Sequence, residues 1–198
     1  MNYLAHLFLA GNEINMLIGN FIADHVKGSG IDSFNPVIQS GIRMHRAIDR
    51  FTDSHPVVSE SIQRLRPVYR KYAGVIVDIY YDHFLATSWK HYCDESLSSF
   101  TNRTYRLLSS QKDILPARSQ RILSYMSTYD WLQSYAHLGG IHQAFKGMAS
   151  RTTFESGMEH ASFTLEKNYE LFQKEFNIFF PMLIEFVSSE FPTTIRNK

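Results

Sequence analysis

"GIRMHRAIDRFTD", residues 41–53, is the stretch that decides the fold. Its apolar residues follow the period of an α-helix that buries one face. His45, Asp49 and Asp53 are spaced four residues apart, and each such step rotates the chain by only about 40° around the helix axis. An imidazole and two carboxylates therefore form one stripe along the predicted helix.

The same period dominates the rest of the chain, whereas the alternation expected of strands is almost absent. The expected helices cover residues 13–27, 36–52, 56–65, 68–92, 96–110, 117–129, 141–149 and 154–191. Pro67 is expected to break the chain between two of them, and Pro181 to kink the last. No internal repeat, low-complexity tract or long linker divides the sequence. We therefore expect one all-α domain, a single-domain helical bundle over residues 1–198.

The composition is that of a folded protein. Hydrophobic residues make up 44% of the chain, and 15 Phe and 11 Tyr supply area for a large core. A net charge of +1 gives no sign of a nucleic-acid partner. Cys93 is the single cysteine, which excludes an internal disulfide framework and a cysteine-rich zinc site. The N-terminus lacks the basic start of a signal peptide, and no stretch has the roughly 18–20 apolar residues of a membrane span. We expect a cytoplasmic protein without membrane insertion.

Charge is distributed unevenly along the chain. Residues 43–71 hold seven Lys or Arg against three Asp or Glu, whereas residues 155–190 hold seven Glu against two Lys. If a site uses the three carboxylates of the first segment, its outer face is strongly basic. Such a face would attract an acidic partner.

Two further stretches place His and Asp among apolar residues. In "GNFIADHVKG", residues 19–28, Asp24 closes a predicted helix, and in "VDIYYDHFL", residues 77–85, Asp78 and Asp82 are four residues apart. Ionisable groups in such surroundings are costly to bury unless they are paired or bind a metal. Imidazoles and carboxylates without thiolates suit Mn²⁺, Mg²⁺ or Fe²⁺. The three stretches together predict a divalent-metal site.

Each stretch also has a structural explanation. The stripe from His45 to Asp53 is also what a solvated helix face paired with Arg46 and Arg50 would show. Asp24 also suits a helix end, and a lone His6 is more often a core histidine than a ligand. Other catalytic patterns are missing: the chain has no glycine-rich phosphate loop after a strand and no G-x-S-x-G motif.

Five motifs occur in an order and at spacings that resemble the acyl carrier protein phosphodiesterase family. They are "NYLAHLFLA", "GNFIADHVKG", "GIRMHRAIDRFTD", "DIYYDHFLATSW" and "GMASR", spread over residues 2–151. The resemblance implies an all-helical, HD-domain-like fold from a divergent branch of the HD-domain phosphohydrolases, and an enzyme that prefers Mn²⁺. It also implies hydrolysis, by metal-activated water, of the phosphodiester that joins 4′-phosphopantetheine to a serine of holo-acyl carrier protein, the acidic protein partner.

The resemblance also implies roles for the matching residues. The metal ligands would be Asp24, His45, Asp49, Asp82 and His6. The catalytic residues would be Asp78, His83 and Arg46, with His83 protonating the leaving serine oxygen. The substrate would bind to Arg43, Arg50 and Arg151. The usual HD signature contains a contiguous His-Asp, whereas here the order is reversed at residues 24–25 and 82–83. The division between ligands and general acid therefore stays open.

Two other functions compete with this interpretation. The first is an HD-type phosphohydrolase that acts on nucleotides, which would prefer free nucleotides to holo-acyl carrier protein. The second is a non-enzymatic helical binding protein whose His and Asp stripes are structural ion pairs. Stoichiometric metal would distinguish an enzyme from that binding protein.

Overall fold

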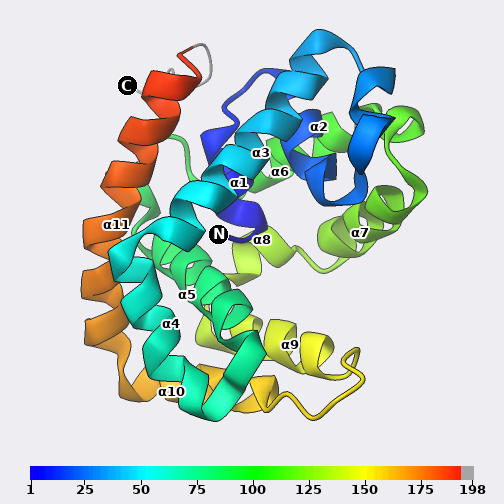
Figure 1. The fold of residues 1–198 in the computed structure, drawn as a ribbon. Helices are drawn as coiled ribbons and strands as arrows, with labels where there is room; N and C mark the ends of the chain where they lie inside the picture. The colour runs from blue at the N-terminus through cyan, green and yellow to red at the C-terminus, as the bar shows by residue number, and fades with distance from the viewer. Residues whose placement is uncertain (193–198) are drawn as a thin grey trace.

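The computed structural model describes residues 1–192, and no strand occurs among them. Figure 1 shows the helices, which are α1 (Tyr3–Leu9), α2 (Ile14–Ile22), α3 (Pro36–Ser54), α4 (Pro56–Tyr69), α5 (Ala73–Thr87), α6 (Leu97–Ser110), α7 (Ala117–Thr128), α8 (Trp131–Ser134), α9 (Leu138–Ala149), α10 (Ala161–Lys167) and α11 (Tyr169–Glu190). Their apolar faces join in one continuous hydrophobic core. The predicted all-α class is confirmed.

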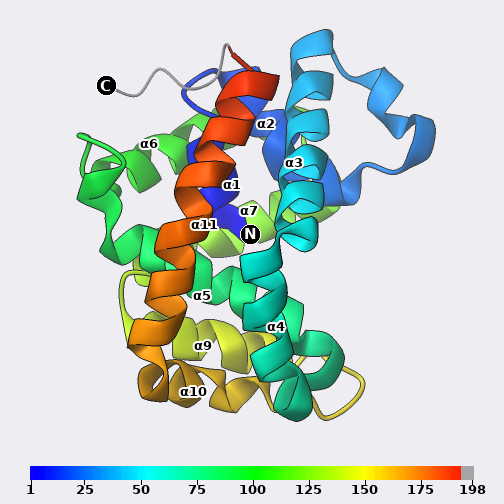
Figure 2. The ribbon, with the colours of Figure 1, turned by 60° about the vertical axis from the view of Figure 1, so that its left-hand side comes forward.

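Helix α5 runs through the middle of the molecule and contacts α1, α4, α9 and α11. Its side chains are buried on nearly every side, which explains the apolar composition of its sequence. Tyr81 and Phe84 pack against Phe176 of α11 with ring centroids 5.7 and 5.9 Å apart. Figure 2 shows α11 lying alongside α3 and α4, which follow each other in one line. These contacts hold α3 and α5 in place around the functional site.

Helices α2 and α3 cross at two glycines. A Cβ atom on Gly19 would lie 2.1 Å from the carbonyl oxygen of Ile38, and one on Gly41 would lie 2.5 Å from that of Met16. Neither position can carry a side chain without moving a backbone. The close approach brings the residue after Gly19, which is Asn20, against α3.

Pro67 does not break the chain between two helices as expected. Pro67 lies inside α4, which continues to Tyr69 and ends where Arg70 adopts a φ of 52°. Leu65 and Tyr69 lie four residues apart, and both are buried, so burial keeps the last turn helical despite the lost hydrogen bond. Pro181 likewise lies inside α11.

Four segments depart from the predicted helices. The helix expected over residues 68–92 is shorter, because α4 continues to Tyr69, a 3₁₀ turn follows at Arg70–Tyr72, and α5 spans Ala73–Thr87. Helix α1 lies where no helix is expected, because "NYLAHLFLA" is too short to show a helical period. Helix α8 was also not predicted. The single helix expected over residues 154–191 is two, α10 and α11, which meet at Asn168, and a loop with Gly157 at a φ of 66° precedes them. No helix among the described residues is long and apolar enough to cross a membrane.

Candidate metal centre

His6 on α1 and His45 and Asp49 on α3 bring their ligand atoms together. Nε2 of His6 lies 3.1 Å from Oδ1 of Asp49, and Nε2 of His45 lies 3.2 Å from Oδ2 of the same carboxylate. The four-residue spacing of His45 and Asp49 within one helix produces the second contact. Oδ1 of Asp24, from the 3₁₀ helix after α2, lies 3.3 Å from Nε2 of His45. We call these four residues the His–Asp cluster.

The two imidazole rings of the cluster are held by their surroundings. They stack with centroids 4.0 Å apart and planes 20° apart, and His6 and His45 are both buried. Nδ1 of His45 donates a hydrogen bond to Oδ1 of Asn20 at 3.2 Å, which turns Nε2 toward Asp24 and Asp49. Sequence reasoning missed Asn20, although it lies in the "GNFIADHVKG" motif beside the glycine that permits the close crossing.

Burial and neighbouring charges set opposite pKa values for the two histidines. Burial and the charge of His45 lower the pKa of His6 to about 4, so its imidazole is neutral at pH 7. Burial also lowers the pKa of His45, but hydrogen bonds to Asp24 and Asp49 outweigh it and raise the value to about 9. For Asp49, burial opposes ionisation, yet hydrogen bonds from His45 and His6 hold the pKa of its carboxyl below the usual range.

The donor set fits a divalent cation. The carboxylates of Asp24 and Asp49 converge on Nε2 of His45 and stabilise a proton on that nitrogen. A metal cation at the same place would be stabilised by the same two negative charges, once it displaces this proton. The ligand atoms of His6, His45 and Asp49 all lie within 4.8 Å of one another, which suits one shared ion. Nδ1 of His6 is buried without a hydrogen-bond partner in the described chain. No protein acceptor therefore holds the imidazole proton on Nδ1, and the fold does not determine which ring nitrogen carries it.

Asp82 does not join this cluster. Its Oδ2 accepts a hydrogen bond from the N–H of Leu4 at 2.8 Å, and its Oδ1 accepts from the N–H groups of Asn2 at 3.3 Å and Ala5 at 3.2 Å. Asp82 therefore caps the free amides at the start of α1 from inside the core. Burial raises the pKa of its carboxyl to about 7.

His83 also lies away from the cluster. Its Nδ1 lies 2.7 Å from the carbonyl oxygen of Tyr135, and its Nε2 lies 3.0 Å from the hydroxyl of Tyr169. Both ring nitrogens thus have hydrogen-bond partners outside α5. The imidazole joins α5 to the segment after α8 and to α11, and it does not face the pocket described next.

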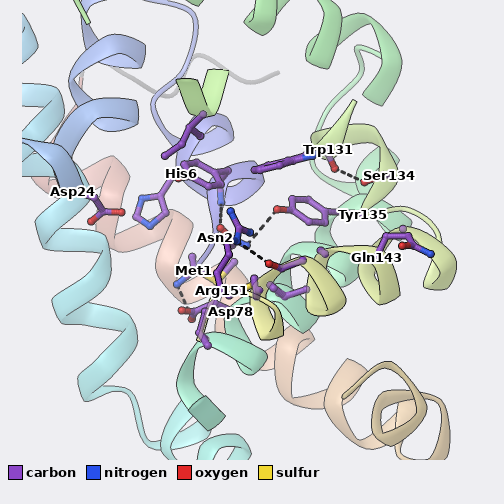
Figure 3. Close-up of a pocket in the computed structure, with 18 of the residues that line it drawn as sticks. Met1, Asn2, His6, Asp24, Asp78, Trp131, Ser134, Tyr135, Gln143 and Arg151 are labelled. Atoms are coloured by element: carbon purple, nitrogen blue, oxygen red, sulfur yellow. Dashed lines mark hydrogen bonds and ion pairs between the residues drawn. The ribbon is translucent and has the colours of Figure 1, made fainter. Parts of the chain in front are cut away.

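The His–Asp cluster opens into a cavity of about 890 Å³. Figure 3 shows His6 and Asp24 at one side and Ser134 and Gln143 at the other, with Arg151 between them in this view. Further lining comes from Tyr3, Asp53, Asp78, Arg118, Tyr129, Trp131, Tyr135 and Met148. One side of the cavity in this view therefore carries an imidazole and a carboxylate, and the other carries aromatic, hydroxyl and amide groups.

The predicted catalytic and substrate residues are divided between this cavity and the surface. Asp78 lines the cavity, and its Oδ1 accepts a hydrogen bond from the amino group of Met1 at 2.9 Å. Arg151 also lines it. Arg46, by contrast, uses Nη2 to donate to the carbonyl oxygen of Val26 at 2.8 Å and is not among the lining residues.

The remaining two predicted substrate residues lie on the outer face of α3. Arg43 and Arg50 are both exposed, and Nη1 of Arg43 donates to Oε1 of Gln39 at 3.4 Å. They do not line the cavity. Tyr3 and Arg118 do line it and were missed by sequence reasoning. Arg118 stands in no recognisable motif, whereas Tyr3 lies in "NYLAHLFLA".

Comparisons with known proteins identify the family of this chain. The family model for acyl carrier protein phosphodiesterase matches residues 1–183. A protein of that name from Serratia proteamaculans is 33% identical over 93% of this chain and 96% of its own length. Namesakes from Yersinia enterocolitica and Escherichia coli O6:H1 are each 34% identical with the same coverage. No solved structure matches significantly. The family match extends over all five motifs and every residue of the His–Asp cluster, and the chain belongs to the acyl carrier protein phosphodiesterase family.

Proposed function

We propose that this protein hydrolyses the phosphodiester of holo-acyl carrier protein and releases 4′-phosphopantetheine and apo-acyl carrier protein. The observation that carries the proposal is the convergence of His6, His45 and Asp49 at one wall of a cavity of about 890 Å³. The family relationship supplies the substrate, since relatives that share a third of the sequence carry the name of this activity.

In this proposal the His–Asp cluster holds one divalent cation, with Mn²⁺ favoured over Mg²⁺ and Fe²⁺ by the resemblance. When bound, such a cation polarises a phosphoryl oxygen and makes water a better nucleophile at neutral pH. His6 is suited to the role of metal ligand because its imidazole is neutral at pH 7, which is the form that binds a metal. Asn20 orients His45 so that Nε2 faces the site.

Other residues of the chain bind the substrate and move protons. Arg151 projects into the cavity with a guanidinium group that suits two phosphoryl oxygens. Asp78 is the proposed proton acceptor, because its carboxylate lines the same cavity. Asp78 would then pass the accepted proton to the leaving serine oxygen. Arg46 and His83 are given positioning roles in this scheme, because Nη2 of Arg46 donates to Val26 and both ring nitrogens of His83 have partners within the fold.

The carrier protein is proposed to dock on the outer face of α3. Arg43 and Arg50 are exposed and seven residues apart, so they lie on one side of the helix. They attract an acidic protein while the cavity receives its prosthetic group. The expected location is the cytoplasm, where a chain with one cysteine stays reduced.

Mass spectrometry of the carrier protein tests the proposal. Incubation of holo-acyl carrier protein with this protein and Mn²⁺ should remove the phosphopantetheine group, and a chelator should prevent the loss. His45→Gln should abolish turnover, whereas His160→Gln, at an exposed site outside the cavity, should leave it unchanged. Carrier protein that keeps its prosthetic group in the presence of wild-type protein and Mn²⁺ would overturn the proposal.

A further inference from the structure

Tyr3 lines the same cavity as the His–Asp cluster and Arg151. It is the first residue of α1, one helical turn before His6, and its ring packs against Phe21 with centroids 6.0 Å apart. Within residues 1–192 the phenol makes no hydrogen bond to another residue, although it faces the cavity. The packing of the ring therefore holds the hydroxyl of Tyr3 in place, and its O–H is available to donate a hydrogen bond to a ligand.

Charges of both signs act on this phenol. Burial raises the pKa of Tyr3, the charge of Asp24 raises it further, and Arg118 and Arg151 lower it, with a result of about 12. The hydroxyl therefore keeps its proton at neutral pH and is a hydrogen-bond donor. Asp24, Arg118 and Arg151 line the cavity as well, so a carboxylate and two guanidinium groups share it with Tyr3.

Arg118 has no carboxylate partner in the described part of the chain, although it lies at the cavity. Its position is set by the residue that follows it. Oγ of Ser119 lies 2.7 Å from Nδ1 of His25, and His25 directly follows Asp24. This bond joins the start of α7 to the segment that carries Asp24, and both Arg118 and Asp24 line the cavity.

Arg151 approaches from the end of α9. Its Nε donates to the carbonyl oxygen of Gly147 at 2.7 Å, which fixes the direction of the guanidinium group. The two terminal nitrogens make no hydrogen bond within residues 1–192. Two guanidinium groups and a phenol O–H, all without anionic partners of the protein, form a set of donors that matches the non-bridging oxygens of a phosphoryl group.

We propose that Tyr3, Arg118 and Arg151 form a phosphoryl-oxygen binding site in the cavity into which the His–Asp cluster opens. The proposal rests on the proposed function and deepens it, since it assigns the residues that hold the phosphodiester against the cation. Tyr3 donates its hydroxyl proton to one oxygen, and the two arginines bind the others. Tyr3 connects the phosphoryl-oxygen binding site to the His–Asp cluster, because α1 carries both Tyr3 and His6.

Calorimetric binding of free 4′-phosphopantetheine, the phosphomonoester product, tests the site without turnover. The ligand is titrated into wild-type protein with Mn²⁺ and into chelator-treated protein. Tyr3→Phe and Arg118→Gln should each weaken binding about tenfold or more in both forms, because each removes a hydrogen bond to a charged group. Arg118→Lys should recover part of the loss, since it restores the charge without the planar fork.

Two matched controls lie on the same helix as Arg118 but outside the cavity. Tyr125→Phe and Arg121→Gln alter exposed side chains of α7 and should keep the wild-type affinity. Circular dichroism should show wild-type helix content for all variants. Equal affinity of Tyr3→Phe, Arg118→Gln and wild-type protein would overturn the inference, as would the absence of phosphopantetheine binding to the wild type in either form.

The outcome is separable from that of the proposed function. If wild-type protein does not hydrolyse holo-acyl carrier protein but the binding losses appear, the phosphoryl site stands and the proposed reaction fails. If wild-type protein does hydrolyse it, and Tyr3→Phe and Arg118→Gln keep both affinity and kcat/KM, the inference fails alone.

Discussion

Asn20 fixes the orientation of His45: its Oδ1 atom lies 3.2 Å from Nδ1 of the imidazole, deep in the crossing of α2 and α3. The contact exists because Gly19 and Gly41 allow the two backbones to approach closely. Through it, a residue outside the proposed ligand set decides which nitrogen of His45 faces the site.

Removal of this partner should weaken metal binding without unfolding the protein. Asn20→Ala is expected to lower Mn²⁺ affinity about 10- to 100-fold, the usual cost of losing the residue that orients a ligating histidine. Calorimetric titration with Mn²⁺ measures it, and Asn102→Ala, an exposed asparagine on α6, is the matched control. Unchanged affinity in Asn20→Ala would show that His45 needs no orientation.

Stability of the metal-free protein should fall as pH rises from about 6.5 to 9. The pKa of His45 is raised from 6.5 to about 9 in the folded state, so the folded protein binds a proton that the unfolded chain releases. The stabilisation is fully present below pH 6.5, is lost as pH passes through 9, and amounts to on the order of 2–3 kcal/mol. Denaturant unfolding in chelator at pH 6.5 and 9 measures it. His45→Gln should flatten this dependence, and a slope that persists in the variant would assign it to other groups.

Asp82 should prove structural. Asp82→Asn is expected to reduce the free energy of unfolding by about 1–3 kcal/mol, because an amide NH₂ replaces one carboxyl oxygen and leaves a buried N–H of Leu4 or Ala5 without its acceptor. At saturating Mn²⁺ the folded variant should still bind one ion. Asp113→Asn, at an exposed site, serves as the control. A variant of normal stability that binds no metal would restore Asp82 as a ligand.

His83 should affect stability more than catalysis. His83→Ala leaves the carbonyl of Tyr135 and the hydroxyl of Tyr169 without their partner, so the unfolding free energy should drop by about 1–3 kcal/mol. Loss of kcat should stay below the roughly 10²- to 10⁴-fold expected when a general acid is removed. A loss within that range at unchanged stability would identify His83 as the acid after all.

The outer face of α3 should govern capture of the substrate. Arg43→Gln with Arg50→Gln is expected to raise KM for holo-acyl carrier protein, leave kcat unchanged and reduce the effect of added salt on kcat/KM. Arg106→Gln, an exposed arginine on α6, is the control. If the double variant keeps the wild-type KM and salt dependence, the carrier protein docks elsewhere.

Part of this structure follows from sequence periodicity. The stripe of His45 and Asp49 on α3 is a local property of one helix, so four-residue spacing predicts it. The all-α class follows from the same period. The end of α4 does not follow from the period, because the burial of Leu65 and Tyr69 outweighs the energetic cost of Pro67. That burial depends on helices that lie elsewhere in the chain.

The candidate site shows the same division. Asp82 and Asp49 look equivalent in the sequence, each four residues from another site candidate. Only the packing of α1 on α5 turns Asp82 toward backbone amides. Arg118 belongs to the cavity because Ser119 binds His25, more than ninety positions away, and no local pattern carries that contact.

Anomalous diffraction from Mn²⁺-loaded crystals tests the central claim most directly. We predict one peak about 2.0–2.3 Å from Nε2 of His6, Nε2 of His45 and a carboxylate oxygen of Asp49. A peak beside Asp82 and His83, or none at the His–Asp cluster, would contradict it.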